Sequence, residues 1–406
     1  MELSAIDNIG TGATKVLKNF HKLKQIVKDE LTPITYSQSE LYKLLKYTDR
    51  PIAANTLAKE MITMAEQGYE FKRTHANSYI LNRDDCIAVA DFIGVKKYRA
   101  ETDGKAYIVQ IQNLKGGVGK SMGTNMLATA LVHMPRYLLK DIRVLIVDLD
   151  PQSTSTQHNA PENAINEGTY TSIALMCDDA DKAEIDQHGI IKNVAHNIDI
   201  IPCSTGDGFY ADDLDLPETR GNYKYQELLL KRIIEKYETD YDFILLDAGP
   251  HMDKVMKNCL WAVNGVYIPV PTTFYDFDST LNFLSRLPIV MKQLVEDGMD
   301  LSKLDFVKPY ISKSSNSENQ QDKEVYENAS IDLAEIFGHE NTIKNDLPEE
   351  DVYERCAENG GTVFTIKPKD YPGSSAPFKR AKSAAEKWAN ELITGMMTHH
   401  KKRGSN

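Results

Sequence analysis

The chain has few of the features expected of secreted or membrane-spanning proteins. Its 406 residues include five cysteines, odd in number and never two residues apart, so neither a disulfide framework nor a CxxC metal motif is expected. Its longest apolar runs, such as residues 144–147 and 243–246, are far too short to cross a bilayer. The start has no basic segment before an apolar stretch, so a cytoplasmic location is the expectation.

Positive charge is also scarce, because the net charge is −12. The basic residues are unevenly placed. Residues 1–106 carry 16 Lys and Arg against 14 Asp and Glu, and residues 366–406 carry nine against three, so the excess of acidic residues lies between them. A nucleic-acid partner is therefore expected to meet the ends of the chain or a local patch.

One glycine-rich loop, KGGVGKS at residues 115–121, is the most informative segment that is present. It follows the strand-like residues 107–111 and precedes the helix-like residues 122–131. Glycines allow successive backbone N–H groups to converge on a phosphate, and the following helix directs its positive end toward it. In such a loop Lys120 binds the β- and γ-phosphates of a nucleotide, and Ser121 binds Mg²⁺. The predicted nucleotide contacts are Gly116, Gly117, Val118, Gly119, Lys120, Ser121 and Met122.

This loop departs from the usual P-loop at two positions. Leu114 stands where the usual pattern has its first glycine, and Lys115 adds a second cation. Residues 113–121 thereby resemble the deviant Walker A motif of the ParA, MinD and nitrogenase iron-protein ATPases. The resemblance implies that Lys115 crosses a dimer interface to the nucleotide of the partner subunit, like an arginine finger supplied in trans. In a monomer, Lys115 is one more exposed lysine.

Two carboxylates follow the strand-like residues 144–147. Asp148 and Asp150, two positions apart, share a face at the carboxyl end of this strand, where open α/β sheets bind their ligands. The segment resembles the Walker A′ motif of the same family. The resemblance implies that Asp150 positions the attacking water and that Asp148 supports the Mg²⁺ shell. The alternative is a pair of carboxylates that only cap the strand end.

The apolar run 243–246 ends in Asp247, which is typical of a Walker B strand whose aspartate holds Mg²⁺ through water. The related ATPases continue into a Pro-Pro pair, whereas this chain has Ala-Gly-Pro at residues 248–250. Pro271 occupies the place where the family lines its adenine pocket. These resemblances imply ATP, ADP and Mg²⁺ as ligands of the domain.

Residues 32–96 show a pattern of helix, turn, helix and basic hairpin. A capping box at residues 37–40 begins the first helix, a second helix is expected over residues 52–67, and the alternating residues 69–73 and 78–81 predict a hairpin. This order matches a winged helix-turn-helix domain. The expected base-edge contacts are Asn55, Thr56 and Lys59, and the expected phosphate contacts are Lys72 and Arg73. The alternative is a small helical domain that contacts only protein.

An amphipathic helix is predicted before this domain, because Val16, Phe20, Leu23 and Val27 recur at helical spacing. Its apolar face is expected either to pack on the adjacent domain or to form a dimerisation arm. From residue 107 onward, strand-like and helical patterns alternate, which predicts a doubly wound, mostly parallel α/β P-loop ATPase domain. The expected organisation is an N-terminal helix at 1–31, a winged helix-turn-helix at 32–96, a linker at 97–106, the ATPase domain at 107–398 and a basic tail at 399–406.

Three classes of protein share such an ATPase domain. The whole chain resembles the long ParA type, which implies a weak, partner-stimulated ATPase that partitions a plasmid as a homodimer and represses its own operon. The implied partners are a ParB-like centromere-binding protein, operator DNA and non-specific nucleoid DNA, the last through Arg355, with no membrane. A MinD-like membrane-cycling ATPase with an amphipathic terminal helix, and a metabolic enzyme or reductase of the same fold, are the alternatives.

Overall fold

The computed structural model describes residues 3–164, 170–315 and 319–404, and its centre is an eight-stranded sheet with the order β3-β4-β2-β5-β1-β6-β7-β8. All neighbouring strands are parallel except β3 and β4. The predicted doubly wound, mostly parallel α/β fold is confirmed. The strands are β1 (Tyr107–Ile111), β2 (Val144–Leu149), β3 (Ile191–Ala195), β4 (Ile198–Ile201), β5 (Phe243–Ala248), β6 (Gly265–Pro271), β7 (Phe306–Ser314) and β8 (Leu347–Pro348).

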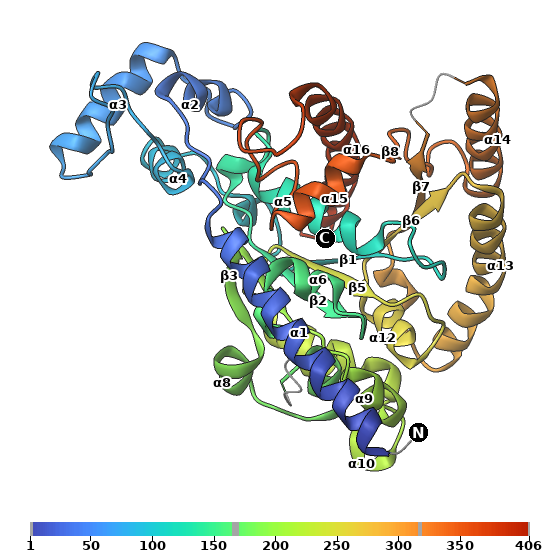
Figure 1. Ribbon diagram of the computed structural model, residues 1–406. Coiled ribbons are helices and arrows are strands. Elements are labelled where there is room, and N and C mark those ends of the chain that lie inside the picture. Colours follow the sequence, from blue (N-terminus) through green and yellow to red (C-terminus); the bar gives the residue numbers. More distant parts are fainter. Residues whose placement is uncertain (1–2, 165–169, 316–318, 405–406) are drawn as a thin grey trace.

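Helices cover both faces of this sheet, and a smaller helical unit lies to one side (Figure 1). In chain order they are α1 (Leu3–Asp29), α2 (Gln38–Leu45), α3 (Ala54–Glu66), α4 (Arg83–Phe92), α5 (Lys120–His133), α6 (Thr154–Asn159), α7 (Ser172–Cys177), α8 (Lys182–Glu184), α9 (Asp207–Asp213), α10 (Pro217–Arg220), α11 (Glu235–Tyr237), α12 (Lys254–Ala262), α13 (Phe274–Glu296), α14 (Gln320–Phe337), α15 (Asp351–Glu358) and α16 (Ser375–Arg403).

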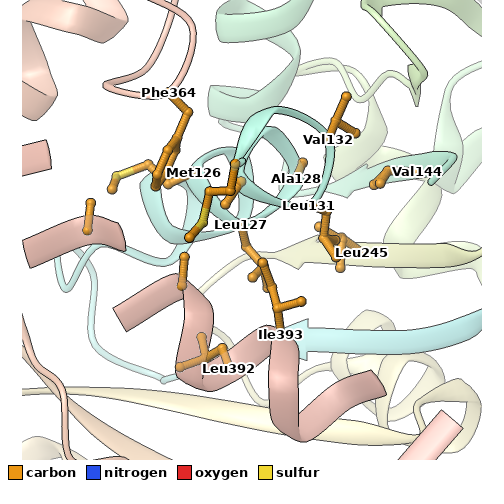
Figure 2. Packing of buried hydrophobic residues seen from close by; sticks show 14 of the residues in the cluster. Met126, Leu127, Ala128, Leu131, Val132, Val144, Leu245, Phe364, Leu392 and Ile393 are labelled. Carbon is orange, nitrogen blue, oxygen red and sulfur yellow. The ribbon is translucent and has the colours of Figure 1, made fainter. Parts of the chain in front are cut away.

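Two apolar layers hold the sheet between its helices, because successive strand residues point to opposite faces. In β1, Val109 packs into the layer beneath α5 and α16, whereas Ile108 packs into the layer beneath α7, α12 and α13. Figure 2 shows the first layer, in which Leu127 and Leu131 of α5 pack near Ile393 of α16. Both leucines are fully buried, and each such burial contributes about 1.5–3 kcal/mol. Helix α5 is thereby fixed at the centre of the domain.

The smaller unit consists of α2, α3, a hairpin and α4. The predicted capping box of α2 is confirmed, because Ser37 and Glu40 exchange the two expected hydrogen bonds. The hairpin is short, with one bridge between Arg73 and Tyr79. Helix α4 has its own capping box and was not predicted. The core of this unit includes Leu138 and Leu139, which follow α5, so the unit packs on the ATPase domain.

Helix α1 packs on the protein with its polar side. His21 is buried, and the Lys28 ammonium donates to the carbonyl of Asn159. The predicted apolar stripe faces outward instead, and Val16 and Phe20 are 67% and 59% exposed. The expectation that this stripe packs on the adjacent domain is wrong, because His21 and Lys28 occupy the side of the helix that meets the domain.

Helix α16 continues through Arg403, so residues 399–403 of the expected basic tail are helical, while residues 405–406 lie outside the described residues. The Arg403 guanidinium donates to Asp305 at 2.9 Å, which anchors this end on the sheet. Along the described part of the chain, no helix combines the length and apolar character needed to pass through a membrane.

Candidate nucleotide-binding site

The glycine loop joins β1 to α5 in the conformation of a phosphate cradle. Gly117 and Gly119 have φ values of +75° and +93°, a region that side chains with a Cβ rarely adopt. Gly119 caps α5, so the amide groups of the first helical turn face the loop. The Lys120 ammonium donates to the Lys115 carbonyl at 3.0 Å, across the space that the loop encloses. Val118 is buried beneath the loop.

Lys120 is a buried cation at the edge of an acidic group of residues. Burial lowers the pKa of Lys120, and the charges of Asp247 and Asp150 offset part of this effect. Among the described residues, the side-chain hydrogen bond of Lys120 goes to a neutral carbonyl, so most of its charge is left for a ligand. A nucleotide phosphate is the ligand that the surrounding amide groups also favour.

Asp247 lies at the end of β5 and is fully buried. Its Oδ2 accepts a 2.6 Å hydrogen bond from Ser155, but its Oδ1 has no partner among the described residues. Burial raises the pKa of Asp247 to about 6, although the Ser155 and Ser121 hydroxyl groups lower it. A buried carboxylate oxygen without a partner, close to a serine hydroxyl, suits a hard divalent cation. The residues present therefore fit Mg²⁺, with Ser121 and Asp247 as the groups that would hold it.

Asp148 lies directly beside Asp247 in the paired strands β2 and β5. Its Oδ2 accepts hydrogen bonds from the backbone and hydroxyl groups of Thr156, both at 2.7 Å, and its Oδ1 accepts one from the Asp150 backbone. Burial and the charge of Asp247 raise the pKa of Asp148 well above its usual value. The structure shows Asp148 anchoring α6 beneath the site. Its expected contribution to the Mg²⁺ shell stays a prediction.

Asp150 follows the end of β2 and lines the cavity that begins at the glycine loop. Its Oδ1 accepts a 2.9 Å hydrogen bond from the Gln152 backbone, which keeps the carboxylate close to the turn that follows β2. The backbone of Gly249 lies beside it, and a Cβ at that position would be 3.4 Å from Oδ1. The Ala-Gly-Pro segment thus brings the end of β5 against Asp150.

A cavity of about 580 Å³ extends from this cradle toward the C-terminal part of the chain. Gly116, Lys120 and Met122 line the end at the phosphate cradle. The rest of the lining includes residues for which the sequence predicted no nucleotide role, among them Lys24, Tyr353, Glu354, Ala357, Thr362 and Val363. Pro271 is buried at the end of β6 and is not among the lining residues, so the cavity gives no support to its expected adenine contact. No local motif marks the α15 residues, because their position depends on packing against α16.

Lys115 points away from this cavity. Its ammonium lies 3.2 Å from Oδ1 of Asp276 at the start of α13, and its side chain is 41% exposed. Its backbone N–H donates to the side chain of Asn113, which also donates to the Pro269 carbonyl and to Thr280. The buried Asn113 therefore fixes the position from which the Lys115 side chain leaves the loop.

The expected DNA contacts lie on two separate surfaces. Asn55, Thr56 and Lys59 are exposed on α3, whose opposite side buries Leu57, Met61 and Met64. Lys72 and Arg73 are exposed on the hairpin, and Arg73 donates to Tyr79 at 2.8 Å while lying over its ring. Arg355 is exposed on α15, and no ion pair of it occurs within the described ranges.

Comparisons with known proteins identify the family of the chain. A family model described as an AAA domain matches residues 106–299. Over 401 residues the chain is 31% identical to plasmid partition protein A from Escherichia coli, covering 96% of this chain and 97% of that protein. A solved partition protein matches 98% of both chains, with a TM-score of 0.72 and 23% identity. An ATP complex of McdA from Cyanothece matches 69% of this chain and 96% of its own, with a TM-score of 0.50 and 18% identity. Because the similarity to the Escherichia coli protein spans nearly the whole chain, this protein belongs to the ParA family of plasmid partition ATPases.

Proposed function

We propose that this protein is a Mg²⁺-dependent ATPase whose ATP-bound homodimer binds nucleoid DNA without sequence preference. Its N-terminal unit, residues 32–96, binds operator DNA and represses the operon that encodes it. Hydrolysis is weak and is stimulated by a ParB-like centromere-binding protein. Ser121 and Asp247 would hold Mg²⁺, which would supply positive charge to the nucleotide phosphates.

The position of Lys115 carries this proposal. Lys120 lies within the glycine loop and lines the cavity. The Lys115 ammonium lies outside the cavity of its own subunit, in a partly exposed ion pair with Asp276. A cation so placed does not help to bind its own nucleotide. It is free to act on a second copy of the chain, in which it neutralises the added charge of a triphosphate. Dimerisation then depends on whether ATP or ADP is bound.

The exposed stripe of α1 supports a second contact between copies. Val16, Phe20, Leu23 and Val27 lie on its outer side, while the inner side is held on the domain by polar contacts. Large apolar side chains gathered on one exposed helix face indicate a protein partner. A second α1 is the proposed partner, since four-three-four spacing suits a short helical pair.

The two exposed basic surfaces support two modes of DNA binding. Helix α3 presents Asn55 and Lys59 outward beside the hairpin with Lys72 and Arg73, which suits contacts to base edges and phosphates. Arg355 on α15 lies beyond this unit and is assigned to phosphate contacts without sequence preference.

The membrane-cycling alternative has less support. The apolar side of α16, including Trp388, Leu392 and Ile393, is fully buried against the sheet, so it is occupied. A metabolic function rests on the fold alone, whereas the similarity to the partition protein extends through the N-terminal unit.

Sedimentation of the intact protein tests the proposal. It is measured without nucleotide, with ADP and with a non-hydrolysable ATP analogue, each with and without random-sequence duplex DNA. The expected result is a duplex-bound dimer with the analogue only, and its affinity falls steeply as salt is raised. Duplex binding that is equal in all three nucleotide states would refute the proposed coupling.

A further inference from the structure

The inner face of α1 carries three nitrogen-bearing side chains. His21, Lys24 and Lys28 are three and four residues apart, so they lie on one side of the helix. The first and the last of them are engaged: the His21 ring donates to the Pro161 carbonyl, and the Lys28 ammonium donates to the Asn159 carbonyl. These two contacts hold α1 against the end of α6 and fix the position of Lys24 between them (Figure 1).

The backbone of α1 also lies close to the loop that follows α15. Gly360 in this loop has a φ of +73°, and a Cβ at that position would lie 2.7 Å from Cβ of Lys28 and 2.8 Å from its Cα. Glycine permits this close approach. Lys24 lies one helical turn before Lys28, and it lines the nucleotide cavity together with Ala357 and Gly361.

Lys24 is the member of this face whose charge is not used. Its side chain is partly buried, and it makes no hydrogen bond or close ion pair with the residues that the structure describes. Burial lowers the pKa of Lys24, and the charge of Glu358 on α15 offsets part of this effect. A cation partly withdrawn from water is unfavourable without a partner, and acceptor atoms of a ligand in the cavity would supply one.

Helix α5 shows which end of the nucleotide cavity Lys24 occupies. The first two turns of α5, as far as Met126, line this cavity, whereas Thr129 on the third turn lines a neighbouring cavity together with Lys28. Lys24 therefore lies at the end that is remote from the glycine loop. Met126 follows Ser121 by about 7.5 Å along the helix axis, at a rise of about 1.5 Å per residue.

We propose that Lys24 is a nucleotide-binding residue, whose ammonium donates hydrogen bonds to the ribose and base of bound ADP or ATP. This inference rests on the proposed binding of a nucleotide in this cavity. When the phosphates occupy the glycine loop, the nucleoside occupies the remainder of the cavity, where Lys24 lies. The Glu354 carboxylate also lines the cavity, and Glu358 lies near Lys24, so an uncharged nucleoside suits this end better than a phosphate does.

The proposed contact gives the nucleotide a second effect within one subunit. Lys24 belongs to α1, whereas the glycine loop belongs to the ATPase domain. A nucleotide that meets both of them fastens α1 to the domain. Because ADP and ATP share the same nucleoside, either one has this effect. An ammonium with three donors on a flexible stem suits such a contact.

Isothermal titration calorimetry with ADP and Mg²⁺ tests the contact in the full-length protein. Lys24→Gln should weaken ADP binding by about tenfold, as expected for the loss of a charged hydrogen bond. Lys22→Gln is the matched control, because Lys22 is exposed on the same helix and lines neither cavity. Circular dichroism confirms that each variant is folded. Unchanged ADP affinity in folded Lys24→Gln would overturn the contact alone, whereas failure of the original protein to bind ADP would contradict the proposed function.

A second variant and a second measurement separate a nucleotide contact from a structural ion pair. Glu358→Gln removes the carboxylate that acts on Lys24 and should bind ADP at least as tightly as the original protein. A loss of affinity equal to that of Lys24→Gln would overturn the proposal, because it would mean that Lys24 only pairs with α15.

Hydrogen exchange reports on α1 directly. Saturating ADP should slow amide exchange over residues 21–28 and over the glycine loop in the original protein. In Lys24→Gln, saturating ADP should slow exchange over the glycine loop alone. Slowing that persists over residues 21–28 in this variant would show that Lys24 does not join α1 to the nucleotide.

Discussion

The ammonium of Lys115 is held 3.2 Å from the carboxylate of Asp276, so the lysine that distinguishes this P-loop is paired within its own subunit. Partial burial alone would raise the pKa of Asp276, but a hydrogen bond from Thr273 and the charge of Lys115 bring it below its usual value. Both side chains remain partly exposed, and such pairs contribute only about 0–1 kcal/mol. The pair is therefore weak enough for Lys115 to exchange Asp276 for a phosphate.

Removing the charge of Asp276 should favour the dimer. In Asp276→Asn, Lys115 no longer gives up an ion pair when it meets the partner's nucleotide, so the ATP-dependent dimer should tighten by up to about fivefold. Sedimentation at several protein concentrations measures the change. Asp278→Asn is the control, since Asp278 is exposed two residues away and, among the described residues, its carboxylate accepts a hydrogen bond from Asn282 alone. A weaker dimer in Asp276→Asn would mean that Asp276 supports the interface itself.

Single substitutions should separate the roles of the two lysines of the loop. Lys120→Gln removes the buried cation of the cradle and should abolish binding of ATP and ADP. Lys115→Ala should leave ADP affinity near that of the original protein, because its side chain lies outside the cavity, and should eliminate the ATP-dependent dimer. Fluorescent-nucleotide titration and sedimentation measure these two effects. Equal loss of nucleotide binding in both variants would show that the division of roles is wrong.

Asp150 is expected to act in hydrolysis and not in binding. It lies on the cavity wall, whereas the hydrogen bonds that hold the floor of the site belong to Asp148 and Asp247. Asp150→Ala should therefore bind ATP, accumulate as a dimer and hydrolyse at least a hundredfold more slowly. Phosphate release under single-turnover conditions gives the rate. Turnover at the original rate would remove the water-positioning role from Asp150.

Asp247 should lower the stability of the nucleotide-free protein at neutral pH. Its pKa is about 6 in the folded chain against 3.8 when unperturbed, so the folded state binds its proton more tightly. Protonation of Asp247 therefore stabilises the folded state, and this contribution to the free energy of unfolding is complete below pH 3.8 and is lost as the pH rises through 6. Asp247→Asn should raise the free energy of unfolding at pH 7.5 by roughly 3 kcal/mol while abolishing Mg²⁺-dependent nucleotide binding. Urea denaturation at pH 5 and pH 7.5 measures this, and an equal effect at both values would exclude the ionisation of Asp247 as the cause.

Sequence patterns predicted the parts of the site that lie within single segments. The glycine loop and the two strand-end carboxylates are local motifs, and parallel strands place their carboxyl ends at one edge of the sheet, so Asp148 and Asp247 meet directly. The capping box of Ser37 and Glu40 is equally local.

Features that depend on packing between distant segments could not be predicted in this way. Thr156 binds Asp148 only because α6 folds back beneath β2, and Tyr353 reaches the cavity only because α15 packs on α16. The orientation of α1, whose apolar face points outward and whose polar face meets the domain, likewise depends on packing between distant segments. Periodicity identifies an apolar face, but it does not say whether that face or the opposite one meets the domain.

The two DNA-binding surfaces should respond separately to single substitutions. Lys59→Ala should weaken operator binding by about tenfold and leave ATP-dependent binding to random duplex unchanged. The reason is that Lys59 is exposed on α3 and lies outside the proposed surface for random duplex on α15. Arg355→Ala should do the reverse, and it should reduce the salt dependence of random-duplex binding by about one phosphate contact per subunit. Fluorescence anisotropy at several salt concentrations measures both, with Lys369→Ala as an exposed control in the loop before α16. Since the two residues lie on different elements, a variant that lost both activities together would show that operator and nucleoid DNA share one surface.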